Sequence, residues 1–206
     1  MRLMILLAVC CLTANIGLSG CQPDSETIIK LDTIFINQTD TLIVNQLDTV
    51  ELTEYIADSA TTWILLRHAE TTGAGSNPVL SAAGEERAEV LRQMFNKVPL
   101  DAAFASQYIR TKNTVQPTAI DHSLNLQEYS ASAYAGLITT IEQQYEGGTV
   151  LVAGHSNTVP SILNILTKSN QFTDLSETQY DNLYIVSVYK SGKNKILQLK
   201  YGKPTP

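Results

Sequence analysis

The sequence predicts a three-layer α/β domain with a mainly parallel central sheet over residues 61–206. Short apolar runs alternate along this region with segments in which apolar residues recur at helical spacing. The runs at 63–66 and 149–153 are almost uninterrupted by polar residues, which is typical of strands covered on both faces. Strands that alternate with helices in this way are typical of the α/β class.

The expected elements follow in chain order. Strands are expected at 63–66, 102–105, 124–126 and 149–153, and helices after Ser81, at 108–120, at 134–145 and after Asn157 or Thr158. Ser81 can cap a helix in which Ala88, Leu91, Phe95 and Val98 recur. Pro117 predicts a bend or an end in the second helix. The strands at 183–189 and 196–201 flank Ser191-Gly192-Lys193-Asn194, which predicts a hairpin.

The first 20 residues are expected to be a signal peptide. Met1-Arg2 precedes an apolar run at 3–12, which is shorter than the roughly 20 apolar residues that a spanning helix needs. Leu18-Ser19-Gly20-Cys21 resembles the lipobox of bacterial lipoproteins. That resemblance implies cleavage before Cys21, lipidation of Cys21, and anchoring to a bacterial membrane on the extracytoplasmic or periplasmic face of the cell envelope. The alternative is an ordinary secretory signal with a chance cysteine.

Residues 21–60 are expected to form a tether. Three similar units of eight residues occupy 31–38, 39–46 and 47–54. Because eight is even, an extended chain places the apolar residues of successive units on one side. Two readings remain open, an interaction stalk and a tether of no fixed shape.

Composition restricts the classes of partner. The net charge is −6 and the isoelectric point is about 5.0, which argues against a nucleic-acid partner because phosphate backbones are bound by clusters of Lys and Arg. A local pocket can still bind a phosphate monoester. The chain has only three histidines, and two of them follow predicted strands.

The ends of three predicted strands carry the residues that are suited to chemistry. Arg67-His68, the segment 106–110 and Gly154-His155 each lie just past a strand. Ligands of such sheets bind beyond the carboxyl ends of the strands, so these residues are expected to converge on one pocket.

Four motifs in this order resemble the histidine phosphatase superfamily, which has the phosphoglycerate mutase-like fold. They are Arg67-His68-Ala69-Glu70-Thr71, Leu80-Ser81-x-x-Gly84, Ser106-x-x-x-Arg110-Thr111 and Gly154-His155-Ser156-Asn157. The resemblance extends over roughly residues 62–202 and points to a short, uncapped branch of the family.

The resemblance implies a role for each matched residue. His68 is the expected nucleophile and forms a phosphohistidine, which water then hydrolyses. Arg67, Arg110 and His155 are expected to bind the phosphoryl oxygens, and the helix that begins near Asn157 adds backbone N–H groups. No cofactor or metal is implied. Cationic neighbours favour the neutral imidazole that the attack needs.

The general acid is less clearly marked. Glu128, after the third predicted strand, is the nearest match to the acid of the mutase-like branch. Glu70, Asp121 and the lack of a dedicated acid are the alternatives. His122 lies in a polar loop and is assigned no function.

The expected activity is hydrolysis of a phosphomonoester. Between Ala119 and Thr149 there is no room for a large lid, so a small phosphorylated metabolite, a phosphosugar or a phosphoprotein is the expected substrate. A phosphoglycerate mutase-type transfer is less favoured, because a mutase must shield its phosphoenzyme from water. The alternative from another class is a catalytically weak phosphoryl-binding module of the cell envelope. The sequence leaves the oligomeric state open.

Overall fold

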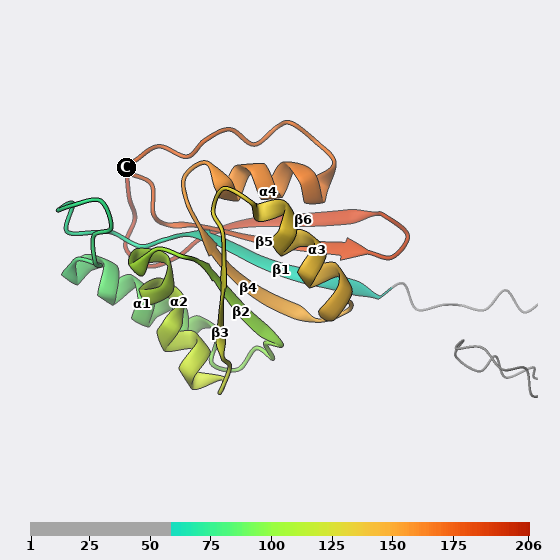
Figure 1. Ribbon diagram of the computed structural model, residues 1–206, viewed down its shortest axis with the longest axis horizontal. Helices are drawn as coiled ribbons and strands as arrows, with labels where there is room; N and C mark the ends of the chain where they lie inside the picture. The colour runs from blue at the N-terminus through green and yellow to red at the C-terminus, as the bar shows by residue number, and fades with distance from the viewer. Residues whose placement is uncertain (1–58) are drawn as a thin grey trace, which may run out of the picture. The chain divides into compact units, whose positions relative to one another are not determined.

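A six-stranded sheet forms the centre of residues 59–206, the part of the chain that this computed structural model describes (Figure 1). The strand order is β3-β2-β4-β1-β5-β6. The strands are β1 (Ala60–Arg67), β2 (Ala102–Ser106), β3 (Leu126–Tyr129), β4 (Thr149–Gly154), β5 (Asn182–Tyr189) and β6 (Asn194–Lys200). The helices are α1 (Ala82–Phe95), α2 (Ile109–Asp121), α3 (Tyr134–Gln144) and α4 (Thr158–Thr167). The expected signal peptide, the lipidated Cys21 and the repeats at 31–54 lie outside the described residues.

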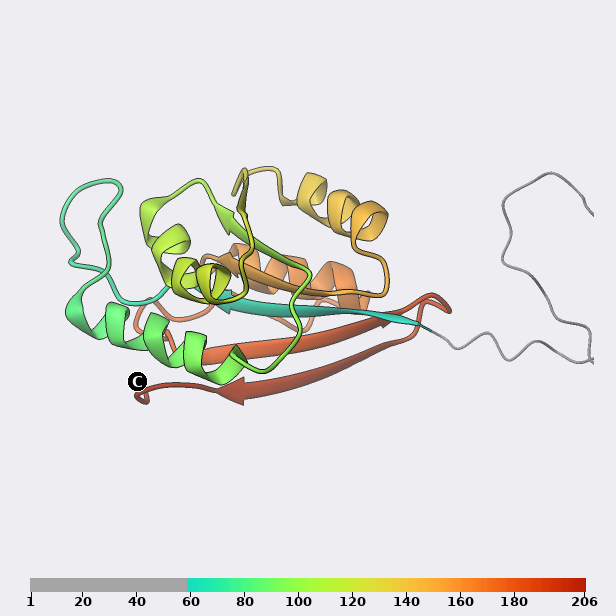
Figure 2. The same cartoon turned by 90° about the horizontal axis from the view of Figure 1, so that it is seen from below.

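The sheet is parallel over four strands and antiparallel at one side. β1 pairs with β4, β4 with β2 and β2 with β3, all in parallel. β5 runs antiparallel to both β1 and β6 (Figure 2). The expected α/β class and the mainly parallel sheet are confirmed, and the C-terminal hairpin makes the sheet mixed.

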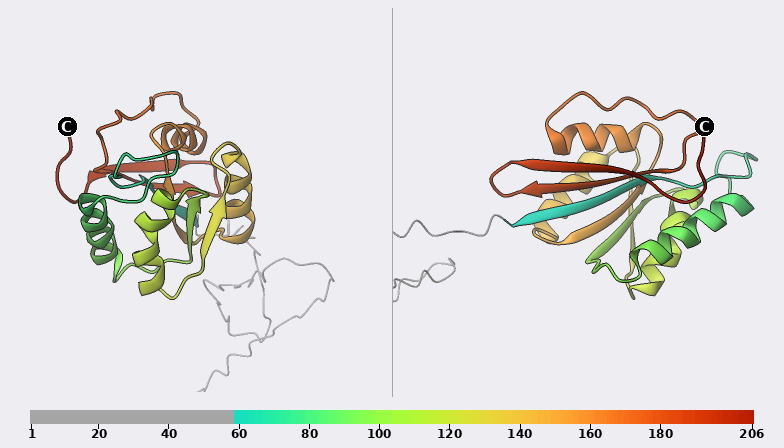
Figure 3. Two further views of the ribbon diagram at one scale, coloured as in Figure 1. Left: turned by 60° about the vertical axis from the view of Figure 1, so that its left-hand side comes forward. Right: turned by 180° about the vertical axis from the view of Figure 1, so that it is seen from behind.

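The side chains of β1 explain why both faces of the sheet carry helices. Trp63 and Leu65 are buried in the cluster that includes residues of α3 and α4, whereas Ile64 and Leu66 are buried in the cluster that includes residues of α1 and α2. Successive residues of a strand point to opposite faces, so an uninterrupted apolar run needs a cover on each side. Figure 3 shows the sheet between the two pairs of helices.

Two element boundaries differ from the sequence prediction. α2 continues through Pro117 to Asp121, so Pro117 does not end the helix. β3 begins at Leu126 instead of residue 124 and runs to Tyr129. Its burial pattern is weak, with a single fully buried residue, and a short half-exposed edge strand gives little periodicity from which to place its ends. This shift decides the position of Glu128.

The glycine in the second motif permits a close backbone approach. A Cβ atom at Gly84 would collide with the backbone carbonyl of Glu70, and that carbonyl accepts a hydrogen bond of 3.0 Å from the Ser81 N–H. The Ser81 hydroxyl in turn accepts from the Gly84 N–H, which confirms Ser81 as the cap of α1. Helix α1 is therefore held against the segment that follows His68.

Across residues 59–206, no helix is both long enough and apolar enough to cross a membrane.

Candidate active site

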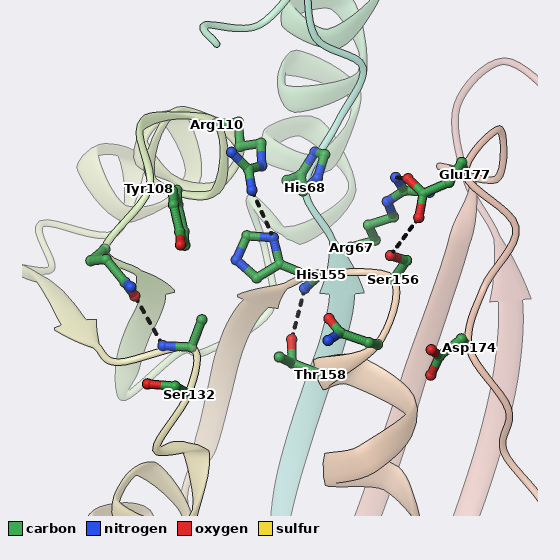
Figure 4. A pocket seen from close by; sticks show the side chains of 13 residues that line it. Arg67, His68, Tyr108, Arg110, Ser132, His155, Ser156, Thr158, Asp174 and Glu177 are labelled. Atoms are coloured by element: carbon green, nitrogen blue, oxygen red, sulfur yellow. Dashed lines mark hydrogen bonds and ion pairs between the residues drawn. The ribbon is translucent and has the colours of Figure 1, made fainter. Parts of the chain in front are cut away.

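A pocket of about 670 Å³ lies at the carboxyl ends of β1, β2 and β4 (Figure 4). Most of its lining side chains are polar or charged. They are Arg67, His68, Gln107, Tyr108, Arg110, Ser132, His155, Ser156, Asn157, Thr158, Asp174 and Glu177, with Ala131 beside them. The expected convergence of the strand ends on one pocket agrees with this geometry.

His68 is held with one ring nitrogen free. Its backbone N–H donates to the Gly154 carbonyl at 2.9 Å, which ties the end of β1 to the end of β4. Its Nδ1 lies 2.8 Å from the Ala69 carbonyl oxygen. A carbonyl can only accept, so Nδ1 carries the hydrogen and Nε2 keeps its lone pair. Burial, together with the positive charges of Arg67 and Arg110, lowers the pKa of His68 to about 3, so the ring is neutral at physiological pH.

His155 lies beside His68, with the ring centroids 5.5 Å apart. Its backbone N–H donates to Thr158 Oγ1 at 2.8 Å, which fixes the loop between β4 and α4. Its Nδ1 lies 3.4 Å from Arg110 Nη2. Figure 4 shows the two side chains facing each other. Burial and the charges of Arg110 and Arg67 lower the pKa of His155 to about 4. Both pocket histidines are therefore neutral in the free protein.

Arg110 reaches the pocket from the first turn of α2. Its guanidinium lies 4.4 Å from the centroid of the Tyr108 ring, and that ring packs edge-on against His155. The backbone N–H of Ile109 donates to Asn77 Oδ1 at 3.0 Å, so a side chain from the loop between β1 and α1 satisfies the start of α2. These contacts position Arg110 beside the two histidines.

Arg67 is buried and points toward the loop before β5. Its Nη1 donates to the carbonyls of Ser176 and Gln179 at 2.8 and 3.2 Å, and its Nη2 donates to Glu177 Oε2 at 2.7 Å. Its guanidinium also lies 4.4 Å from the centroid of the Tyr180 ring. Among the described residues, its buried Nε has no hydrogen-bond partner. Arg67 therefore supplies positive charge to the pocket, and its Nε–H remains without a partner among the described residues.

Glu177 belongs to the pocket but was not singled out by sequence reasoning. It accepts from Ser156 Oγ at 3.0 Å and from Arg67. The hydrogen bond from Ser156 and the charge of Arg67 lower the pKa of Glu177, so it is ionised at neutral pH. Its sequence neighbourhood is a polar loop without periodicity, and no local signal marks it. Ser106 was noted only as part of a motif, although it contacts His155 directly.

Glu128 does not lie in this pocket, and the prediction that placed it there is wrong. It lies within β3 opposite Ala105 of β2, and not beyond the end of the strand. Its half-exposed carboxylate accepts from Lys112 Nζ at 3.0 Å. The error follows from the boundary of β3, because a strand that ends at residue 126 would have put Glu128 in the loop at the sheet edge.

The two alternative acids are also engaged elsewhere. Glu70 accepts two hydrogen bonds from the buried Arg87; burial opposes its ionisation, but Arg87 holds its pKa below the ordinary value. Asp121 is the last residue of α2 and accepts from Arg92. Neither residue lines the pocket.

The remaining predicted residues have clear places. Asn157 lines the pocket as the N-cap residue of α4, without a side-chain capping bond. His122 lies at the end of α2, where its Nε2 contacts the Phe95 carbonyl at 3.0 Å, and it does not line the pocket. Within residues 59–206, no group of His, Cys, Asp and Glu is arranged to hold a metal ion.

Comparison with known proteins shows what this domain resembles. Residues 63–143 match the model of the histidine phosphatase superfamily (branch 1). The domain has the histidine phosphatase fold. A mycobacterial glucosyl-3-phosphoglycerate phosphatase resembles it with a TM-score of 0.57 and 11% identity, over 66% of this chain and 97% of that chain. The protein histidine phosphatase SixA, solved with tungstate, resembles it with a TM-score of 0.55 and 14% identity, over 68% of this chain and 96% of that chain.

A third solved structure agrees with these two. The YhfR protein of Bacillus stearothermophilus has a TM-score of 0.56 and 14% identity, over 66% of this chain and 95% of its own length. A search of curated protein sequences gives no match. At these identities the solved structures establish the fold, whereas the chemistry has to be argued from the pocket.

Proposed function

We propose that this protein is a phosphomonoester hydrolase that acts through a phosphohistidine at His68. The observation that carries the proposal is the state of His68, whose Nδ1 is engaged by the Ala69 carbonyl. A neutral imidazole with a free Nε2 is a competent nucleophile, and covalent catalysis splits one difficult transfer into two easier ones. The histidine phosphatase fold and the family match over residues 63–143 support a phosphatase.

The surroundings of His68 suit a phosphoryl group. Arg110, Arg67 and His155 surround the nucleophile, and the two guanidinium groups are permanent positive charges. Charge on the equatorial oxygens dominates the barrier of phosphoryl transfer, so cationic donors beside the nucleophile lower that barrier. The P–O bond to the leaving group breaks as the bond from phosphorus to Nε2 forms, and water then attacks the phosphohistidine.

The proposed substrate is a small phosphorylated metabolite, a phosphosugar or a phosphorylated protein side chain. Between Ala119 and Thr149 the chain forms only β3 and α3, without an inserted lid. The structural neighbours named as phosphatases act on glucosyl-3-phosphoglycerate and on phosphohistidine in a protein, which supports both small and protein substrates. A screen of phosphomonoesters and phosphohistidine peptides would rank these classes.

Turnover of p-nitrophenyl phosphate tests the proposed activity. Its leaving group is stable without protonation, so hydrolysis depends on the nucleophile and the phosphate-binding groups. We expect His68→Ala to lose several orders of magnitude in kcat. His122→Ala is the matched control, because His122 lies outside the pocket, and it should keep wild-type turnover. A His68→Ala variant with more than about a tenth of wild-type activity would remove the covalent mechanism.

The rival function is a catalytically weak phosphoryl-binding module. It shares the pocket with the proposed hydrolase and differs in chemistry, so the same assay separates the two. A wild-type protein that binds phosphate but does not hydrolyse p-nitrophenyl phosphate would favour the binding module.

We also propose that Cys21 is acylated and anchors the protein to the bacterial envelope. The support is the sequence Leu18-Ser19-Gly20-Cys21 after a positive start and an apolar run. Cys21→Ser should move the protein out of the membrane fraction and abolish incorporation of labelled fatty acid. Cys10→Ser, which changes a cysteine inside the apolar run, should leave both readouts at wild-type levels. Identical partitioning of wild type and Cys21→Ser would contradict the anchor.

A further inference from the structure

Three buried residues, Thr111, Ser106 and His155, form a hydrogen-bonded row that ends at the pocket lining, where His155 lies. Thr111 Oγ1 lies 2.9 Å from the Ser106 carbonyl and 2.7 Å from the Tyr108 carbonyl. Ser106 Oγ lies 2.8 Å from Thr111 Oγ1 and 2.8 Å from His155 Nε2. Ser106 and Thr111 are completely buried, so water does not share these contacts.

The number of hydroxyl hydrogens in this row determines which atom donates and which accepts in each hydrogen bond. Carbonyl oxygens can only accept, so the single hydroxyl hydrogen of Thr111 points to the carbonyls. Thr111 Oγ1 must then accept from Ser106, which uses the only hydroxyl hydrogen of Ser106. Ser106 Oγ therefore accepts from His155, and the hydrogen of His155 lies on Nε2.

The other side of the ring leads to the same assignment. Arg110 Nη2 faces His155 Nδ1 at 3.4 Å, and a guanidinium can only donate. Nδ1 therefore presents a lone pair to the pocket. His68 and His155 carry their hydrogens on opposite nitrogens, because one is anchored by a carbonyl at Nδ1 and the other by a hydroxyl at Nε2.

We propose that Ser106, oriented by Thr111, is a positioning residue that keeps the hydrogen of His155 on Nε2. Because Nδ1 then has a free lone pair, an oxyanion enters the pocket together with one proton, and this proton binds at His155 Nδ1. A lone pair beside a phosphoryl oxygen is repulsive, and a proton between the two atoms turns that contact into a charge-assisted hydrogen bond. This inference rests on the proposed function and adds the source of the proton that the leaving oxygen needs.

The groups around His155 make this proton uptake depend on the ligand. The titratable and charged groups that face the pocket beside it are Arg67, His68, Tyr108, Arg110, Asp174 and Glu177. In the free protein burial, together with the charges of Arg110 and Arg67, lowers the pKa of His155 and keeps its ring neutral. A bound dianion offsets the arginine charges and favours the protonated ring.

The same proton can serve the leaving group. As phosphorus bonds to His68 Nε2, the P–O bond breaks and the leaving oxygen takes the proton from His155 Nδ1, which gives an alcohol and a neutral His155. When water attacks the phosphohistidine, the P–N bond breaks and His155 Nδ1 takes the proton that water loses. When inorganic phosphate leaves the pocket, His155 gives up this proton, and both rings return to their starting state. Glu128, Glu70 and Asp121, the three carboxylates proposed from the sequence as general acids, do not line the pocket. The proton on His155 can protonate the leaving oxygen in their place.

The tautomer can be read directly in the free protein. Long-range proton–nitrogen NMR spectra of the full chain, with His155→Asn used for assignment, distinguish a ring with its hydrogen on Nε2 from one with it on Nδ1. We expect Nε2–H for His155 and Nδ1–H for His68. In Thr111→Val the Ser106 hydroxyl is free to donate to Nε2, so the fraction of His155 with its hydrogen on Nδ1 should rise above that of wild type, although Arg110 still opposes it. Thr111→Ser keeps the hydroxyl and should keep the wild-type tautomer.

Tungstate provides the binding readout, because it remains a dianion at neutral and mildly alkaline pH. Calorimetry in two buffers with different ionisation enthalpies measures the protons that the protein takes up on binding. We expect about one proton per tungstate for wild type and Thr111→Ser, and less than about half of that for Thr111→Val and Ser106→Ala. A merely structural role of Ser106 would weaken binding without changing the proton count.

The outcomes separate this inference from the proposed function. A neutral His155 with its hydrogen on Nδ1, or tungstate binding without proton uptake, overturns the inference while p-nitrophenyl phosphate turnover still supports the hydrolase. A wild type that does not bind tungstate contradicts both the phosphoryl pocket and the proton uptake. The tautomer of His155 is measured without ligand in either case.

Discussion

At the scale of single residues, the chemistry depends on which nitrogen of each histidine is free. His68 and His155 have pKa values lowered to about 3 and about 4 by burial and by the same two arginines, so both are neutral. They differ in their hydrogen-bond partners, the Ala69 carbonyl and the Ser106 hydroxyl. The sequence places both histidines at strand ends, but it cannot indicate these partners, because the course of the backbone around each ring decides them.

Glu128→Gln tests the corrected position of Glu128. Its carboxylate contacts Lys112 and does not line the pocket, so we expect kcat/KM to stay within about twofold of wild type for both alkyl phosphates and p-nitrophenyl phosphate. A general acid would lose about 10²–10⁴ on the alkyl esters alone. Such a selective loss would restore Glu128 to the acid role and contradict the placement described above.

At the scale of elements, the pocket depends on how strands end and how helices begin. β1 and β4 were predictable because almost uninterrupted apolar runs are typical of strands that are covered on both faces. The predicted bounds of β3 were wrong because the strand is short and half-exposed. As a result, Glu128 was predicted to lie in the loop after β3, whereas it lies within the strand. Glu177 could not be predicted, since only the three-dimensional course of the loop before β5 brings it to Arg67 and Ser156.

Gly84→Ala tests the contact between α1 and the segment after His68. The added Cβ would collide with the Glu70 carbonyl, which must move, so we expect the free energy of unfolding to fall by about 2 kcal/mol or more. Gly136→Ala is the matched control, because nothing lies within 4 Å of its Cβ position in α3. This control should be neutral or stabilising by up to about 1 kcal/mol. Equal urea midpoints for the two variants would show that the close approach at Gly84 is unimportant.

At the scale of the whole molecule, a net negative chain contains a local positive site. The net charge is −6, yet Arg67 and Arg110 add to burial in lowering the pKa of both site histidines. Arg87 links the first motif to the C-terminal segment, because it binds Glu70 and the carbonyls of Tyr201 and Lys203. Titratable groups whose pKa is shifted by folding, such as the site histidines and Glu70, make the free energy of unfolding depend on pH.

The free energy of unfolding should fall in acid because the site histidines are held neutral. Below their ordinary pKa of 6.5 they bind protons in the unfolded chain but not in the folded one, so stability is lost as the pH falls from about 6.5 toward about 4 for His155 and about 3 for His68. Each histidine contributes a slope of at most about 1.4 kcal/mol per pH unit. Urea unfolding across this range should give a flatter dependence for the double variant His68→Asn/His155→Asn. An unchanged slope in that variant would assign the acid sensitivity to other groups.

The central claim is that phosphate is transferred to His68 Nε2, and trapping the phosphoenzyme tests it most directly. The protein is mixed with radiolabelled p-nitrophenyl phosphate and quenched in alkaline detergent, in which phosphohistidine survives. We predict a label that is lost in acid, maps to the peptide containing His68, persists in His122→Ala and is absent from His68→Ala. Turnover by the wild type with no label on His68, or an undiminished label in His68→Ala, would contradict the mechanism.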